Sequence, residues 1–346
     1  MKRHPACALR TAPLQRGVTL IELMVSLTIG LIIMVAVVAA YLGASGAGRT
    51  AEAIGRMNED GQMALTILSQ QLRMAGVNPS QADRSSVTIG LNVRNNSMPT
   101  HNTMTNGFAI RGCDLKFSDV TTAAAGNTSA LTCGHASTST GPDSISIAYE
   151  ADKYNTVPTS AGVPTDCMGN GITALSPAPT YIKSDEATTA TATIYEAENR
   201  FYIGTSTYIV NPTLYCKGKA STQQPLVENI EDLQFSYGVV NPANTVTTSV
   251  TPTFTTTLVV GYLSAWGVDN DTTLASLGVV NPSTPATSTR WNAVKTVRIC
   301  VVVRSENPVS ENSASAKYLN CNGTLTSASD KRLRRAYTTT VVLRNQ

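Results

Sequence analysis

The chain has 346 residues, of which 42% are hydrophobic, 14% charged and 5% aromatic, and its formal net charge is +3. The charged fraction is well below the ~25% that is usual in globular domains. Its 24 glycines follow no collagen-like period, and no long run of like charge points to a histone-like or acidic-tail protein. Only one stretch is apolar enough to span a bilayer, which excludes a polytopic membrane protein.

The N-terminus combines a basic leader with an apolar span. Residues 1–17 contain four basic residues and no acidic one, and residues 18–42 contain a single charged residue, Glu22. A helix of about 25 residues is ~37 Å long, which is enough to cross a hydrocarbon core of ~30 Å. Because a basic flank stays on the cytoplasmic side, we expect all residues after Leu42 to lie across the inner membrane.

Glu22 is the anomalous residue of this span. An acidic side chain inside a membrane costs ~2.5–3.5 kcal/mol at the helix centre and less near an end, so it needs a partner and points to function. Cleavage between Gly17 and Val18 would create an α-amine one helical turn before Glu22. Either this amine or that of a neighbouring copy of the helix would pair with Glu22, and the second pairing would set the register between adjacent helices.

Residues 17–22, Gly-Val-Thr-Leu-Ile-Glu, resemble the type III signal of type IV pilins and pseudopilins. In that family a short basic leader ends in Gly, and Glu is the fifth residue after the cleavage site. The resemblance implies that an inner-membrane prepilin peptidase cleaves after Gly17 and methylates the amine of Val18, and that Glu22 is the assembly residue. The family usually has Phe as its first mature residue, so Val18 departs from the pattern at the methylated position.

Two other interpretations of the N-terminus stay open. A secretory signal peptide has an apolar region of ~7–15 residues before a small-x-small cleavage site; the span here is longer, although residues 39–45 offer small side chains. The other is an uncleaved anchor. N-terminal sequencing separates a start at Val18 from a start at 41–46 or at Met1. Loss of the leader would lower Lys+Arg from 26 to 22 against 23 Asp+Glu, so the mature chain would carry −1 and no nucleic-acid partner is expected.

Residues 43–76 predict a second helical segment. Three glycines at 43, 46 and 48 disfavour a helix by ~1 kcal/mol each, which leaves open a hinge or an uninterrupted helix. From Thr50 onward, apolar residues recur at spacings of three and four, which is typical of an amphipathic helix that packs on a globular domain. Gly76 and Pro79 provide the stop signal.

Residues 77–346 predict a β-rich domain with long polar loops. Alternation or apolar runs favour strands at 143–149, 201–203, 208–210, 232–240, 255–263, 294–304 and 336–343. The run 299–303 is apolar throughout, so it is expected to be central and covered on both faces. Because aromatic residues are few, the core is expected to consist of Val, Ile and Leu with disulfides. The predicted fold class is therefore α+β: a long N-terminal helix, hydrophobic and then amphipathic, packed on a disulfide-stapled β domain.

The cysteines indicate an oxidising compartment. Cys7 lies in the leader, and removal of the leader leaves six cysteines beyond the span, as in periplasmic proteins. Six cysteines allow 15 connectivities, which sequence alone cannot distinguish. We expect the sequence-local pairs Cys113–Cys133, Cys167–Cys216 and Cys300–Cys321, each worth ~3 kcal/mol in the chain-entropy model; the alternative is that one pair stays reduced and buried.

Later stretches resemble the PilW-type minor pilins: LRMAG at 72–76, DSI at 143–145, VENIEDLQFSYG at 227–238, WNAVKTVRICVVVR at 291–304 and RRAYTTTVVLRN at 334–345. The resemblance implies a low-abundance subunit that helps initiate pilus assembly. Its implied partners are other minor and major pilins, the prepilin peptidase that processes it, the inner membrane and a large tip adhesin. The implied location is the inner membrane, single-pass with the C-terminal domain in the periplasm, and then the pilus.

No enzymatic motif stands out, since the sequence has no P-loop, nucleophile elbow or HExxH. Without CxxC, and with His101 and His135 expected on surface loops, we predict no zinc site and no cofactor. The segment 169–174 matches G-x-G-x-x-A outside a strand–helix context, Asp269-Asn270-Asp271 is interpreted as a turn, and the basic residues at 331–335 as a solvated strand approach. The alternatives to a pilus role are a type II secretion minor pseudopilin J, and an adhesin or DNA-uptake module.

Overall fold

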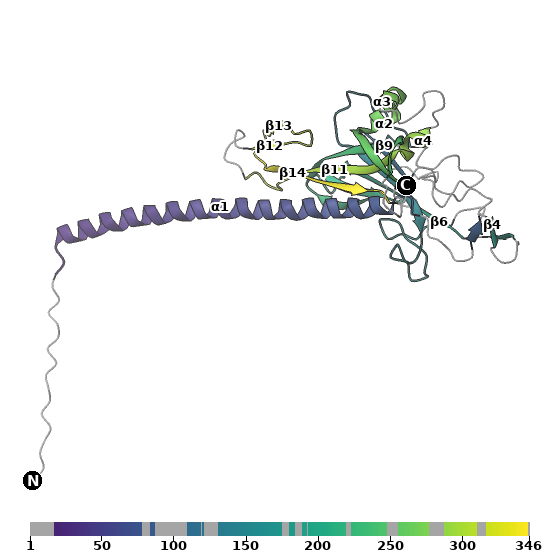
Figure 1. Cartoon of the computed structure of the whole chain (residues 1–346). Coiled ribbons are helices and arrows are strands. Elements are labelled where there is room, and N and C mark those ends of the chain that lie inside the picture. Colours follow the sequence, from purple (N-terminus) through teal and green to yellow (C-terminus); the bar gives the residue numbers. More distant parts are fainter. Residues whose placement is uncertain are drawn as a thin grey trace, which may run out of the picture. The chain divides into compact units, whose positions relative to one another are not determined.

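The computed structural model describes residues 17–77, 84–86, 109–118, 120, 131–174, 180–183, 189–191, 193–218, 223–247, 255–276, 287–309 and 316–344 (Figure 1). The chain divides into two units, residues 1–51 and residues 52–346. Helix α1 contributes to both, and the sheets belong to the second unit.

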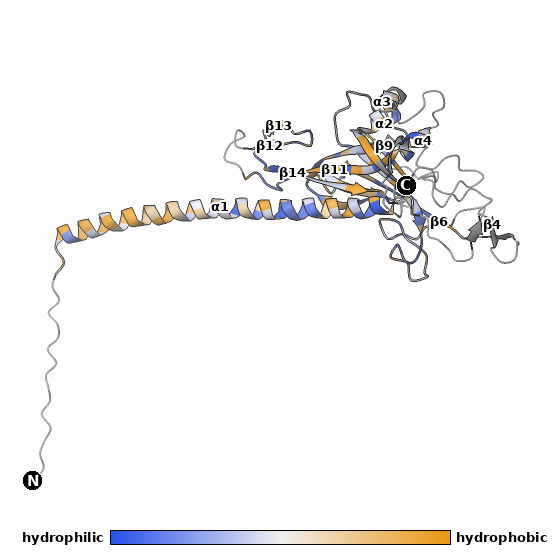
Figure 2. Ribbon diagram, in the orientation of Figure 1, coloured by the Kyte–Doolittle hydropathy of each residue, from blue (hydrophilic) through white to orange (hydrophobic). Residues whose placement is uncertain are grey.

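Helix α1, Leu20–Met74, is a single element of 55 residues. Its first half contains a stretch that is long and apolar enough to cross a membrane, and no residue of that stretch is buried. Figure 2 shows hydrophobic residues all around this half, whereas hydrophilic residues alternate with hydrophobic ones further along. Residues 43–48 are helical, so the three glycines do not interrupt α1.

The end of α1 follows its sequence signal. Gly76 has φ 69°, a left-handed conformation that glycine adopts without steric cost. The Gly76 N–H donates to the carbonyl of Ala148 at 2.9 Å, and the Val77 N–H donates to the carbonyl of Met74 at 2.9 Å. The glycine therefore ends the helix and directs the chain to the first sheet.

That sheet has five antiparallel strands in the order β2-β3-β6-β7-β8. Strand β3 is buried along its whole length, and Ile145 lies opposite Phe201 of β6. The strands are β2 (Ile110–Cys113), β3 (Ser144–Ala151), β6 (Tyr195–Gly204), β7 (Thr213–Lys217) and β8 (Gln224–Glu228).

A second antiparallel sheet has four strands in the order β10-β9-β11-β14. Its strands are β9 (Ile230–Thr247), β10 (Thr255–Leu263), β11 (Val294–Arg304) and β14 (Arg334–Val342). Strand β11 pairs with β9 on one side and with β14 on the other, and residues 299–303 are all buried. The prediction of a central strand covered on both faces is confirmed.

Smaller elements complete the described part of the chain. A three-stranded sheet consists of β1 (Arg84–Ser86), β4 (Thr180–Lys183) and β5 (Thr189–Thr191). A hairpin pairs β12 (Lys317–Leu319) with β13 (Leu325–Ser327). The short helices are α2 (Ala265–Asp269), α3 (Asp271–Ser276) and α4 (Thr287–Asn292).

The second half of α1 packs on the β domain, as the periodicity predicted. Its buried residues follow one face of the helix and join the core of both large sheets. Polar bonds fix the same contact: the Asn199 amide donates to Gln71 Oε1 at 2.8 Å, and the Tyr337 hydroxyl donates to Asn58 Oδ1 at 2.6 Å. The buried helix residues are Met57, Gly61, Ala64, Leu65, Leu68 and Leu72.

The core contains more aromatic side chains than expected. Its largest fully buried side chains include Trp291, Tyr237, Phe117 and Phe201. The Tyr237 and Trp291 rings meet edge to face, with centroids 4.9 Å apart and an interplanar angle of 82°. The expectation of a core of Val, Ile and Leu holds for most of the buried residues but misses the aromatic ones: aromatic residues are few in the whole chain, but several are concentrated in the interior.

Three disulfides join Cys113 to Cys133, Cys167 to Cys216 and Cys300 to Cys321. They are the three sequence-local pairs, with separations of 20, 49 and 21 residues. The first ties the segment before β3 to the last residue of β2. The second anchors a long loop to β7, and the third ties β11 to the hairpin of β12 and β13. Each therefore fixes a loop-rich segment to a strand of a main sheet.

One predicted strand is wrong and several strands were missed. Residues 208–210 form part of the loop between β6 and β7, and Tyr208 is 96% exposed. A loop tip has no neighbouring strand to pair with, so β-branched and aromatic composition alone does not make it a strand. Strands β2, β7, β8, β12 and β13 and the three short helices lack a periodic signal of useful length. His101 and Pro79 lie outside the described residues.

The contact between α1 and β14 depends on Gly61, which faces the ring of Tyr337. A Cβ at this position would lie 2.6–2.8 Å from three ring atoms, whereas a Cβ at Gly55 on the same helix would meet nothing within 4 Å. We expect Gly61→Ala to destabilise the second unit by about 1–3 kcal/mol, because overpacking outweighs the gain in helix propensity. Urea unfolding of the mature chain in detergent measures this.

Gly55→Ala is the matched control, since it adds the same methyl group to the same helix in open space. It is expected to leave stability unchanged or to raise it by up to ~1 kcal/mol. Equal effects of the two substitutions would contradict a close approach of α1 to Tyr337.

Candidate functional site: the start of helix α1

The predicted processing residues lie just before α1. Gly17, Val18 and Thr19 are outside any helix or strand, and Val18 is 70% exposed. A Cβ on Gly17 would have no neighbour within 4 Å. The bond between Gly17 and Val18 is thus in an exposed, non-helical segment directly before the first helical turn.

Thr19 and Glu22 form a capping box at the N-terminus of α1. The Thr19 N–H donates to Glu22 Oε2 at 3.1 Å, and the Glu22 N–H donates to the Thr19 hydroxyl oxygen at 3.3 Å. The Thr19 hydroxyl also donates to Glu22 Oε2 at 3.2 Å. This reciprocal pattern satisfies backbone N–H groups that have no partner inside the helix.

The capping box was missed by the sequence analysis, although its signal is present. Thr-x-x-Glu before an apolar run is the recognised sequence pattern of this cap. Glu22 therefore has a local partner in its own chain, besides any amine. Its carboxylate also lies at the positive end of the helix dipole, which favours a negative charge there.

The capping bonds leave part of Glu22 available. Both bonds to its carboxylate use Oε2, and within the described residues Oε1 makes no hydrogen bond. A carboxylate oxygen can accept further bonds from a cationic donor. The arrangement can thus hold a second, positively charged partner without breaking the cap.

The next turns of α1 keep their polar groups inside the helix. The Ser26 hydroxyl donates to the carbonyl of Glu22 at 2.7 Å, and the Thr28 hydroxyl donates to the carbonyl of Val25 at 2.9 Å. Hydroxyl bonds to the preceding turn satisfy these side chains without water. The exposed surface of this stretch is therefore apolar apart from the capped end.

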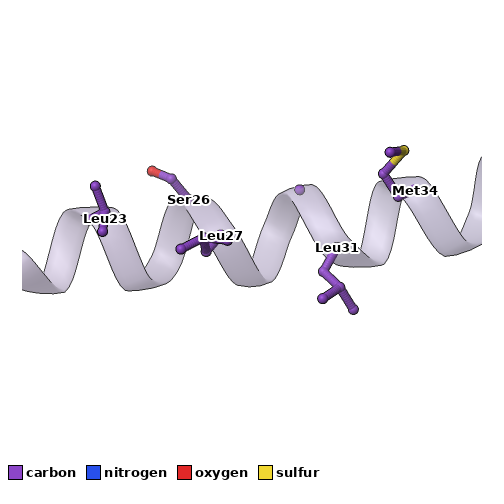
Figure 3. Close-up of a pocket in the computed structure, with 6 residues that line it drawn as sticks. Leu23, Ser26, Leu27, Leu31 and Met34 are labelled. Carbon is purple, nitrogen blue, oxygen red and sulfur yellow. The ribbon is translucent and has the colours of Figure 1, made fainter.

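A shallow apolar hollow lies on the same part of α1. The small residues Ser26 and Gly30, one turn apart, line it together with larger apolar side chains. In Figure 3 Leu23, Ser26 and Met34 point to the same side of the helix. Small residues four apart let a second apolar helix approach closely in a membrane. The other lining residues are Leu27 and Leu31.

The structure corrects the prediction for His135. Its side chain is only 7% exposed and lies between two aspartates, with Nε2 3.3 Å from Asp269 Oδ2 and Nδ1 3.9 Å from Asp114 Oδ2. The Asp114 N–H donates to Nδ1 at 3.3 Å. His135 is thus a buried link between two aspartates, because the Cys113–Cys133 disulfide draws its loop into the domain.

The chemistry of this cluster does not favour a metal. The ligand atoms of Cys113, Cys133 and His135 lie within 4.8 Å of one another. The two sulfur atoms are joined in a disulfide, so they cannot act as the thiolates that bind zinc. Asp269 is already engaged, since the Trp291 indole N–H donates to its Oδ1 at 2.8 Å.

The other motifs are structural in the described residues. Residues 166–171 form a turn in which Asp166 Oδ1 accepts from the Met168 and Asn170 N–H groups, so the glycine pattern does not open a helix. In the basic segment, Arg334 pairs with Glu231 at 2.8 Å and with Asp330 at 2.7 Å. Hydrogen bonding from Arg334 lowers the pKa of Asp330 to about 2.

Comparison with known proteins points to one class. The model of the prokaryotic N-terminal methylation motif matches residues 13–38, which include Gly17, Val18 and Glu22. The model of the type IV pilus-assembly protein W family, PilW, matches residues 200–345, from β6 to the end of β14. No curated protein and no solved structure matched the chain.

These observations define a pilin-class protein: a methylation motif, an apolar helix suited to membrane anchoring, and a helix packed on a disulfide-bonded β domain. The two matches support a PilW-family type IV pilin, a type IV pilus-associated minor pilin. The methylation motif and the pilin match imply processing by a prepilin peptidase and contacts with other pilus components.

The capping box predicts a local effect of Thr19. Thr19→Val keeps the branched shape but removes the hydroxyl that bonds Glu22, and loss of a cap costs roughly 0.5–2 kcal/mol. We expect amide hydrogen exchange of Glu22 and Leu23, whose N–H groups bond Thr19, to become about 5- to 30-fold faster, the factor that corresponds to 1–2 kcal/mol. NMR of the chain in micelles measures it.

Thr19→Ser is the control, since it keeps the hydroxyl and should keep the protection. Unchanged exchange in Thr19→Val would show that Glu22 does not depend on Thr19.

Proposed function

We propose that the chain is a subunit of the complex that initiates a type IV pilus, and that Glu22 is the residue through which it is incorporated. The observation that carries the proposal is the position of Glu22: a carboxylate in the first turn of an exposed apolar helix, five residues after Gly17 and inside the matched methylation motif. The role is structural and not catalytic.

The proposed maturation uses the segment before α1. The prepilin peptidase cleaves after Gly17 and methylates the amine of Val18, and the mature chain begins there. The exposed, non-helical placement of residues 17–19 supports this, because a peptidase needs an extended, accessible bond. Residues 1–17 are the leader, 18–42 the membrane and assembly segment, 43–76 its amphipathic continuation and 77–346 the periplasmic domain.

The proposed assembly step pairs Glu22 with the amine of a neighbouring pilin. Oε1 is the acceptor for that amine, since the capping bonds use Oε2. The pairing matters because an unpaired charge inside a low-dielectric environment is costly. The small residues Ser26 and Gly30 support close packing of the two helices along the same face.

The proposed orientation follows from charge and cysteine placement. The basic leader stays in the cytoplasm, so the domain with its three disulfides lies in the periplasm, an oxidising compartment. The subunit then leaves the inner membrane for the pilus. Its proposed partners there are other minor and major pilins and a large tip adhesin.

A pilus role is favoured over the alternatives. The PilW match over residues 200–345 favours a pilus over a type II secretion pseudopilin. Deletion of the gene distinguishes the two: loss of surface pili and twitching supports the pilus, and loss of exoprotein secretion with intact pili supports the secretion system. A DNA-uptake role has little electrostatic support, since the mature chain would carry about −1 and Arg334 is already paired.

Processing at Gly17 gives one test. Gly17→Asp places a charged side chain beside the bond to be cleaved, so we expect the precursor to accumulate. Gel mobility and mass spectrometry of the membrane fraction measure the fraction that starts at Val18. Gly134→Asp, at an exposed glycine of the second unit, is the control and should be processed normally. A start at Val18 in Gly17→Asp at wild-type level would contradict the cleavage assignment.

Incorporation gives the second test. Glu22→Ala should be processed normally but should fall at least about tenfold in sheared pili, the factor that corresponds to ~1.4 kcal/mol. Quantitative immunoblots of sheared and membrane fractions measure it. Thr19→Val separates the cap from the charge, because it weakens the capping box but keeps the carboxylate. A normal pilus level in Glu22→Ala, or equal losses in both variants, would contradict an assembly role for the carboxylate itself.

A further inference from the structure

A hollow of about 470 Å³ lies at the end of the five-stranded sheet where the loop between β6 and β7 begins and ends. Gly204, Thr205 and Pro212 of this connection line it together with the tyrosines of the two strands. Its size is that of a small-ligand site, ~300–1,000 Å³. The pilus-assembly site at the start of α1 does not involve it. The chargeable and amide side chains around it are Lys116, Gln223 and Glu231.

Two stacked tyrosines form the inner wall of the hollow. The Tyr202 and Tyr215 rings are parallel within 17°, with centroids 5.8 Å apart, and both are buried. Gly204 leaves the space beside them open: a Cβ there would lie 3.3 Å from an atom of each ring. Only a small part of each ring reaches the hollow, since Tyr202 is 3% and Tyr215 is 4% exposed.

The inner wall carries a hydrogen-bonding group without a partner. The Tyr215 hydroxyl is buried and makes no hydrogen bond within the described residues. A buried polar group in this state costs roughly 1–3 kcal/mol, and such a group in a native structure calls for an explanation. Burial, with the neighbouring Tyr215, raises the pKa of Tyr202 to about 12, so that hydroxyl is a neutral donor under physiological conditions.

The remaining polar groups are balanced in charge. Lys116 Nζ lies 5.7 Å from the centre of the Tyr202 ring. Glu231 uses Oε2 for its ion pair with Arg334, and Gln223 offers an amide that can both donate and accept. One cation and one anion favour a ligand without net charge, and amide, carboxylate and hydroxyl groups favour a ligand rich in hydroxyls.

The loop bordering the hollow is held in a defined turn. The Ser206 N–H donates to the carbonyl of Ile209 at 2.9 Å, and the Ile209 N–H donates to the Ser206 hydroxyl at 3.0 Å. Tyr208 is presented outward on this turn and is 96% exposed. A fixed turn lowers the entropic cost of binding, and an exposed aromatic ring provides an apolar face with a polar end.

We propose that this hollow binds a neutral hexopyranose or N-acetylhexosamine residue of a glycan. The small exposed part of the two tyrosine rings contacts the apolar C–H side of the sugar, and Tyr215, Gln223, Lys116 and Glu231 bond its hydroxyls. The mixed lining distinguishes the hollow from a docking groove for a partner's apolar side chain, which would lack two opposite charges and an unpaired hydroxyl. The glycan is either an amino-sugar polymer or a neutral surface glycan.

Saturation-transfer NMR of the full chain tests the proposal. The probes are methyl N-acetyl-β-D-glucosaminide, methyl β-D-galactopyranoside and methyl β-D-glucopyranoside, and the micelles are of a detergent without a sugar headgroup. We expect saturation transfer from the protein to at least one probe with a dissociation constant on the order of 1 mM. Preference for the acetylated probe identifies an amino-sugar polymer, and preference for a hexoside identifies a neutral glycan.

Substitutions locate the binding. Gly204→Ala adds a methyl group against both rings and should weaken binding at least about tenfold. Gln223→Leu removes the amide and should also weaken binding at least about tenfold. Because residue 223 is on the surface, this substitution should leave the fold intact. Gly134→Ala adds a methyl group at an open, exposed glycine and is the control.

Three outcomes would overturn the proposal. One is no saturation transfer from any probe up to about 10 mM, where a millimolar site would be largely occupied. Another is binding that Gly204→Ala and Gln223→Leu both leave unchanged. The third is protection of Lys116 and Tyr208 by a purified pilin but by none of the sugars, which would make the hollow a subunit contact. None of these outcomes bears on Glu22, so the assembly proposal is tested separately.

Discussion

The structure depends on how one helix satisfies its polar groups in two different surroundings. The first half of α1 exposes apolar side chains on all sides, so its backbone and its hydroxyls have to be satisfied within the helix. The Thr19–Glu22 box does this at the N-terminus, and the hydroxyls of Ser26 and Thr28 do it in the next turns. The second half instead buries one face against two sheets. A helix that meets both demands joins a membrane-type surface to a folded domain without a break in its hydrogen bonding.

The β domain compensates for modest regular structure with covalent and polar links. Among the residues whose burial the structure describes, β11 is the only strand of its sheet with a run of five buried residues. The Cys300–Cys321 disulfide ties the β12–β13 hairpin to it. His135 and Asp114 connect the disulfide loop to α2, where the Ala265 and Trp266 N–H groups donate to the Asp114 carboxylate at 2.6 and 2.9 Å. Long polar connections thus end on rigid strands or on buried charged groups, which allows them to vary without loss of the fold.

The sequence predicts those parts in which the local pattern and the tertiary environment agree. The period of the amphipathic helix, the apolar run at 299–303 and the terminal glycine at 76 are each determined by burial or by φ, and these predictions hold. The sequence does not predict parts in which the tertiary environment decides. Tyr208 has strand-like neighbours but no pairing strand, and His135 has a polar local sequence but is drawn inward by a disulfide. Short strands such as β2 and β8 are too short for periodicity to identify.

The start of α1 combines a residue that the sequence identifies with a partner that is easily missed in the sequence. Glu22 is conspicuous in the sequence because it is the only charge in an apolar span, but the capping partner Thr19 is found only when the Thr-x-x-Glu spacing is considered together with it.

The cap also bears on the proposed pairing with an amine. A subunit waits in the membrane before it meets a neighbour, and an unpaired carboxylate would be costly throughout that time. With Oε2 held by Thr19, Glu22 has a partner before assembly and keeps Oε1 for the neighbour afterwards. The local bond to Thr19 and the proposed bond to a neighbouring subunit are therefore compatible. The local bond lowers the cost of keeping the Glu22 carboxylate in the membrane, and the proposed bond depends on that carboxylate.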